Sequence, residues 1–210
     1  MNLTNYYWYF QSAIPSRICD DIVKYGQQLQ DQMAVTGGYG DNKKLNQKQI
    51  KDLKTKRDSN IVWMSDRWIY KEIQPYVHQA NANAGWNFEW DFSESCQFTK
   101  YEKGQFYDWH CDSWDRPYTR QQPNDPSHGK IRKLSVTVTL SDPKDYKGGE
   151  LEFDFRNLDP DKPRKPVKCK EILPKGSLVV FPSFVWHRVC PVKSGERNSL
   201  VIWNLGWPFK

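Results

Sequence analysis

The feature that most constrains the fold is a change in hydrophobic period near residue 95. Beyond it, the segments 134–140 and 151–155 alternate apolar with polar residues, which predicts two half-buried strands. The apolar run 177–181 predicts a fully buried strand, and 197–205 predicts a final one. Short strands separated by Gly- and Pro-containing turns favour a β-sandwich or barrel.

Before residue 95 the apolar residues follow a helical period instead. From a candidate N-cap at Ser16, they fall on one helical face as far as Met33, and Gly37-Gly38 end the pattern. A second helix is predicted over 65–80, where Pro75 should kink or divide it. The first half of the chain is therefore expected to supply helices that pack on the β-rich half.

Length and composition bound the class of protein. A chain of 210 residues fits one domain, with a helical support region over about 1–94 and a β core over about 95–207. The mean hydropathy of −0.85 and the lack of a long apolar run exclude a membrane-spanning helix. An aromatic content of 15% excludes intrinsic disorder. The 5 cysteines include no C-x-x-C pair, so we expect a reduced, cytoplasmic protein with no disulfide framework.

Positive charge is concentrated in one segment. The net charge is +6, which favours anionic or neutral partners. The segment 43–57 is rich in lysine, ends at Arg57 and contains Asp52 as its only acidic residue. Two interpretations stay open, a solvated helix or loop and an electrostatic docking surface. The polar segment 113–130, which contains Trp114, predicts a long functional or mobile loop.

Histidine chemistry is restricted to a short list, because the chain has 4 histidines. In an extended segment His110 and Asp112 point to the same face and can converge on one point. His187 follows a predicted buried strand and supplies a third ligand. Two histidines and a carboxylate with open positions are typical of a non-haem Fe(II) oxygenase, although Zn²⁺ in a hydrolase would accept the same set. Arg197 on the next strand favours iron, because its planar fork suits a carboxylate such as the distal one of 2-oxoglutarate.

Several ordered blocks resemble one family. The stretch 101–112 (YEKGQFYDWHCD) is similar to the Y-x-x-G-Q-x-Y-x-x-H-x-D stretch of the prolyl 4-hydroxylase branch of the Fe(II)/2-oxoglutarate oxygenases. The block 132–140 followed by 148–150, and the block 187–203 with its H-x-x-x-P-V-x-x-G-x-R-x-S spacing, resemble the same branch. The piece 140–151 is similar to bacterial and phage hydroxylases of this group. The resemblance covers about 95–207 and is loose before it.

The resemblance implies a fold, an activity and a set of site residues. The fold would be a double-stranded β-helix of the jelly-roll or cupin type, with N-terminal helices supporting its larger sheet. The activity would be hydroxylation of a peptidyl proline, with Fe(II), 2-oxoglutarate and O₂ as cofactor and co-substrates and ascorbate as a candidate reductant. The implied residues are the iron ligands His110, Asp112 and His187, the co-substrate contacts Tyr101 and Arg197, and the substrate-pocket residues Tyr107, Arg132 and Trp203.

Two other functions are weighed against this one. A nucleic-acid demethylase of the same family would suit the basic pI, but such enzymes carry a second arginine six residues after the co-substrate arginine, where this chain has Trp203. A non-catalytic jelly-roll binding module would not need the metal ligands, and all of them are present. The expected partner is therefore a proline-containing peptide or protein, and a membrane or nucleic acid is disfavoured. The oligomeric state is left open.

Overall fold

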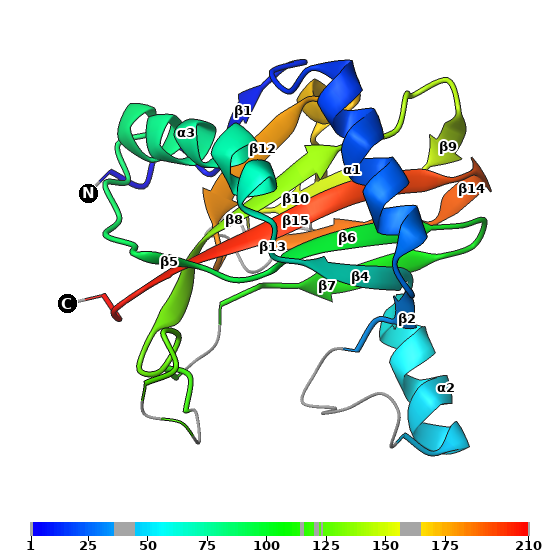
Figure 1. Cartoon of the computed structure of the whole chain (residues 1–210), viewed down its shortest axis with the longest axis horizontal. Coiled ribbons are helices and arrows are strands. Elements are labelled where there is room, and N and C mark those ends of the chain that lie inside the picture. Colours follow the sequence, from blue (N-terminus) through cyan, green and yellow to red (C-terminus); the bar gives the residue numbers. More distant parts are fainter. Residues whose placement is uncertain are drawn as a thin grey trace.

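Two antiparallel β-sheets lie face to face in the computed structural model, which describes residues 2–35, 45–113, 116–119, 122, 124–155 and 165–209 (Figure 1). The larger sheet has eight strands. In spatial order they are β1 (Trp8–Phe10), β12 (Leu178–Pro182), β8 (Ile131–Thr139), β15 (Arg197–Gly206), β6 (Cys96–Tyr101), β4 (Asn60–Met64) and β2 (Gln32–Met33), with β5 (Phe92–Ser93) paired to β15.

The smaller sheet has five strands and carries two of the predicted metal ligands. In spatial order they are β11 (Val167–Lys168), β10 (Leu151–Asp154), β13 (Trp186–Val189), β7 (Phe106–His110) and β3 (Arg57–Asp58). A separate two-stranded sheet pairs β9 (Tyr146–Gly148) with β14 (Val192–Gly195). Gly195 in β14 has a positive φ of 74°, and an added Cβ would lie 2.0 Å from the carbonyl oxygen of Asp145. Only glycine fits this position.

Helices cover the outer face of the larger sheet (Figure 1). They are α1 (Ser16–Gln28) and α3 (Arg67–Asn83). Helix α2 (Gln47–Lys56) projects beyond this sheet and contacts β3 and β7 of the smaller one, and a short 3₁₀ turn, η2 (Lys170–Ile172), precedes β12. Ile22 of α1 and Ile73 of α3 pack in one core with Val136 and Leu200 of the sheet. A second core lies between the two sheets and includes Phe153. Among the described residues, no helix has the length and apolar character needed to cross a membrane.

The first predicted helix begins and ends differently from its prediction. Ser16 is its first helical residue, and Pro15 occupies the N-cap position without a side-chain cap. The helix ends at Gln28, five residues before Met33, because Gln32 and Met33 pair with β4 as strand β2. The predicted stop at Gly37-Gly38 lies outside the described residues.

The second predicted helix is not divided. Helix α3 runs unbroken from Arg67 to Asn83 with Pro75 inside it. Pro75 is exposed, whereas Ile69, Ile73 and Val77 line the opposite, buried face. The burial of that face offsets the one backbone hydrogen bond that proline removes. The first half also contributes strands, because β1 and β4 join the larger sheet where the sequence pattern predicted only helices.

The two strands predicted to be half-buried are buried on both faces. In β8, Val136 faces the helices, whereas Ser135 and Thr137 face the smaller sheet and are at most 7% exposed. Thr137 lines a cavity between the sheets, and the Ser135 hydroxyl donates to the Asp112 carboxylate there. Strand β10 is likewise buried throughout and ends at Asp154, so the predicted Phe155 lies just beyond it. The predictions for 177–181 and 197–205 are confirmed by the buried strands β12 and β15.

Candidate metal centre

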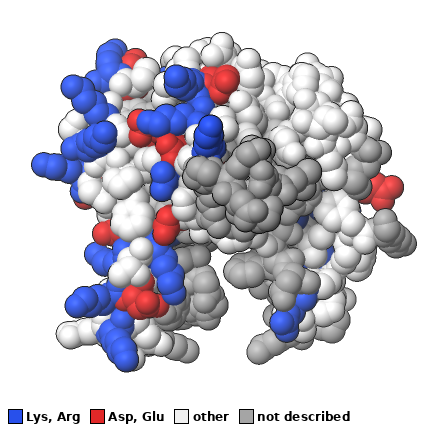
Figure 2. Space-filling model, turned by 180° about the vertical axis from the view of Figure 1, so that it is seen from behind, with Lys and Arg blue, Asp and Glu red and all other residues white. Residues whose placement is uncertain are grey.

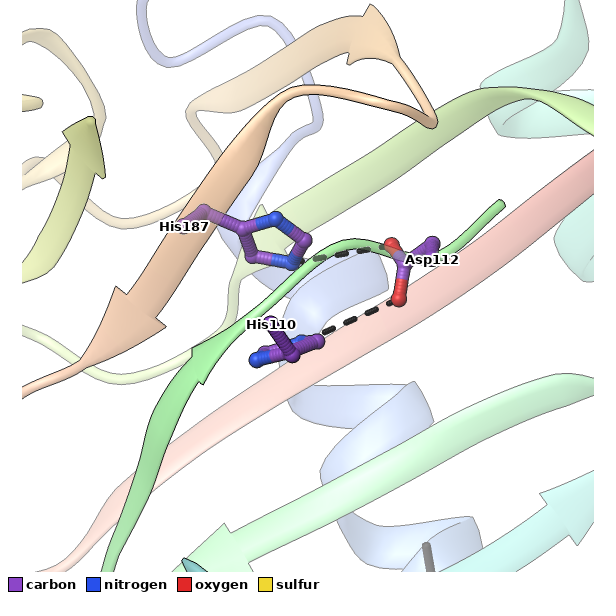
Figure 3. A group of neighbouring side chains, drawn as sticks. All are labelled: His110, Asp112 and His187. Carbon is purple, nitrogen blue, oxygen red and sulfur yellow. Dashed lines mark ion pairs between the residues drawn. The ribbon is translucent and has the colours of Figure 1, made fainter. Parts of the chain in front are cut away.

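Three side chains converge between the sheets, and the sequence predicted all three (Figure 3). His110 ends β7, Asp112 follows it by two residues, and His187 lies in β13. Strands β7 and β13 are antiparallel neighbours, and His110 pairs directly with His187. The Nε2 atoms of His110 and His187 lie 3.8 Å and 3.6 Å from the two carboxylate oxygens of Asp112. Strand pairing therefore brings together two ligands, His110 and His187, that are 187 − 110 = 77 residues apart in the chain.

Backbone carbonyls orient both imidazole rings. The Nδ1–H of His110 donates to the carbonyl oxygen of Asp108 at 2.7 Å, and that of His187 donates to the carbonyl oxygen of Val185 at 2.9 Å. Each bond fixes the tautomer and leaves the Nε2 lone pair free. Both lone pairs face the Asp112 carboxylate (Figure 3). Hydrogen bonds of this kind commonly hold histidine ligands of metals.

Asp112 is held from the other sheet. The Ser135 hydroxyl in β8 donates to Asp112 Oδ2 at 2.7 Å and lies 2.9 Å from the hydroxyl of Ser183. The backbone N–H of Asp112 donates to the Ser183 carbonyl at 2.8 Å. The carboxylate is 6% exposed. Its position therefore depends on both sheets.

The charge states suit a cation. Burial, and then the neighbouring His187, hold the pKa of His110 well below its usual range, so this imidazole is neutral. Burial alone would raise the pKa of Asp112, but the adjacent His187 and His110 outweigh it and hold that pKa at about 2. A neutral imidazole at His110 and an ionised carboxylate at Asp112 result. Their ligand atoms lie within 4.8 Å of one another, so the three residues fit one divalent metal of the facial-triad type.

A cavity opens on this triad. Its empty space, including the open mouth, is about 410 Å³. Asp112 is the only carboxylate among the described residues that line it, so no second carboxylate stands ready as the general base that zinc hydrolysis would need. The polar and aromatic lining residues are Arg57, Gln97, Tyr101, Tyr107, His110, Asp112, Thr137, His187, Arg197, Ser199 and Trp203.

Arg197 and Tyr101, the predicted co-substrate contacts, lie side by side. They are paired neighbours on β15 and β6, and the Arg197 guanidinium carbon is 5.5 Å from the Tyr101 ring centroid. Arg197 is 2% exposed. Within the described residues its guanidinium makes one side-chain hydrogen bond, to the Ser199 hydroxyl at 3.2 Å, and no ion pair. A buried guanidinium without a carboxylate is costly unless a ligand supplies the negative charge.

Tyr107 and Trp203 line the cavity as predicted, but Arg132 is not one of its lining residues. The Arg132 guanidinium carbon lies 3.8 Å from the Trp203 ring centroid, and its Nε and Nη2 donate to Glu94 at 2.9 Å and 2.6 Å. Arg132 therefore fixes Trp203 from outside the cavity. The buried Trp203 indole N–H has no hydrogen-bond partner among the described residues. Sequence reasoning did not identify Glu94.

Arg57 is a charged cavity residue that sequence reasoning missed. It was counted with the basic segment, whose lysines on α2 are exposed as expected for a solvated helix and lie at lower left in Figure 2. Arg57 instead is 4% exposed and lines the cavity. Its partners Gln97 and Ser59 are also buried. The signal that could have found it is the apolar run 61–64, which marks the preceding residues as the entry to a strand. Trp114 lies outside the described residues.

Comparison with protein families gives one match that covers half of the chain. The family model described as the 2OG-Fe(II) oxygenase superfamily matches residues 96–204. A PKHD-type hydroxylase of Synechococcus is 36% identical over 110 residues, which are 52% of this chain and 40% of that protein. A PKHD-type hydroxylase of Shewanella baltica is 36% identical over 107 residues, 50% of this chain and 40% of that protein. The match thus spans less than half the length of these relatives.

Solved structures share the fold over nearly the whole chain. A viral collagen prolyl hydroxylase from Paramecium bursaria Chlorella virus-1, solved with 2OG, aligns with a TM-score of 0.63 at 21% identity and covers 97% of both chains. A prolyl hydroxylase from Trichoplax adhaerens aligns with a TM-score of 0.65 at 17% identity over 96% of this chain and 84% of that one. These likenesses confirm the predicted double-stranded β-helix.

Proposed function

This chain belongs to the 2OG-Fe(II) oxygenase superfamily, and from that premise we propose that it is a dioxygenase that hydroxylates a peptidyl proline. The overall reaction consumes 2-oxoglutarate, O₂ and a C–H bond and yields succinate, CO₂ and 4-hydroxyproline. One observation carries the proposal. The cavity that holds the facial triad also holds Arg197, a guanidinium that is 2% exposed and makes no ion pair within the described part of the chain.

Each group in the cavity then has a task. Fe(II), when bound, supplies the O₂ activation that protein side chains cannot perform. His110, Asp112 and His187 would hold it and leave open positions for the co-substrate. Arg197 and the Tyr101 hydroxyl would bind the distal carboxylate of 2-oxoglutarate, which neutralises the buried guanidinium. Two core strands, β15 and β6, hold both side chains, so the co-substrate would be oriented by rigid elements.

The substrate class is argued from the aromatic walls. Tyr107 and Trp203 line the cavity, and flat aromatic surfaces suit the rigid, apolar ring of a proline in an extended peptide. The Trp203 indole N–H, which has no partner in the described part of the chain, would donate to a peptide carbonyl. Arg132 would act by fixing Trp203, because two of its nitrogens are engaged by Glu94. The names of relatives and fold neighbours, which are hydroxylases and prolyl hydroxylases, support this class.

Mass spectrometry on a peptide panel tests the proposal. The protein is incubated with Fe(II), 2-oxoglutarate, ascorbate and proline-rich peptides, and each peptide is scored for an added oxygen and its position. Lysine- and arginine-containing peptides and methylated oligonucleotides serve as alternative substrates. We expect oxygen on proline alone. Oxidation of another side chain or of a methylated base, with every proline peptide unchanged, would contradict the prolyl assignment but not the oxygenase assignment.

A further inference from the structure

Arg57 lies at the end of a stack of three side chains that begins at a metal ligand. The Tyr107 ring lies face to face on the His110 imidazole, with centroids 3.5 Å apart and planes 13° from parallel. The guanidinium carbon of Arg57 lies 4.4 Å from the Tyr107 ring centroid. Because the imidazole fills one face of Tyr107, the guanidinium lies on the other. The stack therefore runs from Arg57 through Tyr107 to His110.

Neutral partners fix the orientation of Arg57. Its Nε donates to the Ser59 hydroxyl at 3.0 Å, and its Nη2 donates to Gln97 Oε1 at 2.7 Å. It pairs with Tyr107 across β3 and β7. The side chain forms no ion pair with any described residue, so neutralising an acidic group is not its task. A planar guanidinium whose orientation is fixed by two hydrogen bonds can stack on an aromatic ring and restrict its motion.

The two histidine ligands differ in their need for support. His187 is 6% exposed and is enclosed by Phe181 and Phe153, whose ring centroids lie 4.8 Å and 6.4 Å from its own. His110 lies on β7, next to the edge strand β3, and its side chain is 15% exposed. The bond to the Asp108 carbonyl fixes the tautomer of His110 and holds one edge of the ring, so that rotation about this bond is the motion left to restrain. Tyr107 blocks this motion, and Arg57 holds Tyr107.

We propose that Arg57 is a positioning residue of the metal centre, which acts through Tyr107 to hold the His110 imidazole with Nε2 aimed at the metal. This inference rests on the proposed iron site and adds a support that reaches it from outside the β core. Residues that orient a metal ligand typically change metal affinity by about 10- to 100-fold when they are removed.

Removal of Arg57 should change metal affinity in opposite directions, depending on whether Arg57 acts through its charge or by orienting His110. If only its positive charge mattered, its removal would relieve repulsion with a divalent metal and strengthen binding. If it positions His110, its removal would weaken binding. The sign of the change in affinity therefore separates the two effects.

Anaerobic calorimetric titration with Co(II), an O₂-stable substitute for Fe(II), gives the test. We expect Arg57→Met to weaken Co(II) binding about 10-fold and to shift its visible absorption bands. Tyr107→Leu should do the same, whereas Tyr107→Phe, which keeps the ring, should bind like the wild type. The double variant Arg57→Met/Tyr107→Leu should be no weaker than Tyr107→Leu alone, because Arg57 acts only through the ring. Arg197→Met, which removes the other buried arginine of the cavity, is the matched control and should retain Co(II) affinity.

Folding is checked by circular dichroism, and Arg57→Gln, whose Nε2 can take the place of the arginine Nε in the hydrogen bond to Ser59, replaces Arg57→Met if that variant does not fold. Wild-type or stronger Co(II) binding by the folded Arg57 variant would overturn the inference, as would full additivity in the double variant. Either result would leave the proposed function intact. A wild-type protein that binds neither Co(II) nor Fe(II) would contradict the proposed function and this inference together.

Discussion

At the scale of single residues, the site depends on charged side chains that are buried from solvent. Asp112 is the only carboxylate among the described lining residues and is 6% exposed. We predict that Asp112→Ala abolishes metal binding and turnover, because the only anionic ligand is lost without replacement. Metal content after anaerobic loading measures this.

Asp108 offers the matched control for that variant. Its carboxylate is exposed, and it supports His110 through its backbone carbonyl instead. Asp108→Ala should therefore load with metal like the wild type. Full activity in Asp112→Ala would contradict the assigned ligand set.

Arg197 carries the second residue-scale prediction. Arg197→Leu should raise the 2-oxoglutarate concentration needed for half-maximal rate about 10- to 150-fold, since a charged hydrogen bond contributes about 1.5–3 kcal/mol. Metal affinity should be unchanged, and Arg197→Lys should lose less because it keeps the charge. Lys193, which lies four residues before Arg197 in the chain, is exposed on β14 and does not line the cavity. An unchanged 2-oxoglutarate requirement would show that another group binds the carboxylate.

At the scale of elements, close packing of α1 on the larger sheet depends on Gly26. An added Cβ there would lie 2.7 Å from the terminal carbon of Met64 and 2.8 Å from the Phe98 ring. Glycine to alanine in a helix normally stabilises by about 1 kcal/mol, but overpacking costs about 1–3 kcal/mol. We predict that Gly26→Ala lowers the free energy of unfolding in urea. The exposed neighbour Gln27 is the control, because Gln27→Ala should be close to neutral. A more stable Gly26→Ala would mean that α1 can shift on the sheet.

The sequence predicted the elements and site residues that local residue patterns determine. It missed those that depend on the pairing of strands far apart in the chain. The H-x-D triplet and His187 were found because metal ligands have a recognisable spacing. The short strands β2 and β3 were missed, since they exist only through their pairing with β4 and β7. Arg57 was missed for the same reason, because its burial is set by β3 and not by its lysine-rich neighbours. Ser135 was predicted to face solvent, since alternation cannot tell solvent from a cavity between sheets.

At the scale of the whole molecule, the triad joins the two sheets. Its histidines lie on the smaller sheet, and Asp112 is hydrogen-bonded to Ser135 of the larger one. A metal bound there should therefore stabilise the fold as a unit. At a metal concentration 100-fold above Kd, metal binding should raise the free energy of unfolding by about 2.7 kcal/mol. For a chain of this size, this corresponds to a rise in Tm of roughly 5–10 °C. Anaerobic thermal unfolding with Fe(II) measures this, and an equal shift in Asp112→Ala would place the bound metal elsewhere.

The central claim is that this cavity couples 2-oxoglutarate to the hydroxylation of a proline. Turnover of a proline-rich peptide under isotopically labelled O₂, followed by mass spectrometry of both products, tests it most directly. The account predicts one labelled oxygen atom in succinate and one in the hydroxyproline, with neither product formed by Asp112→Ala. Succinate without label, or a peptide left unmodified while 2-oxoglutarate is not consumed, would contradict it.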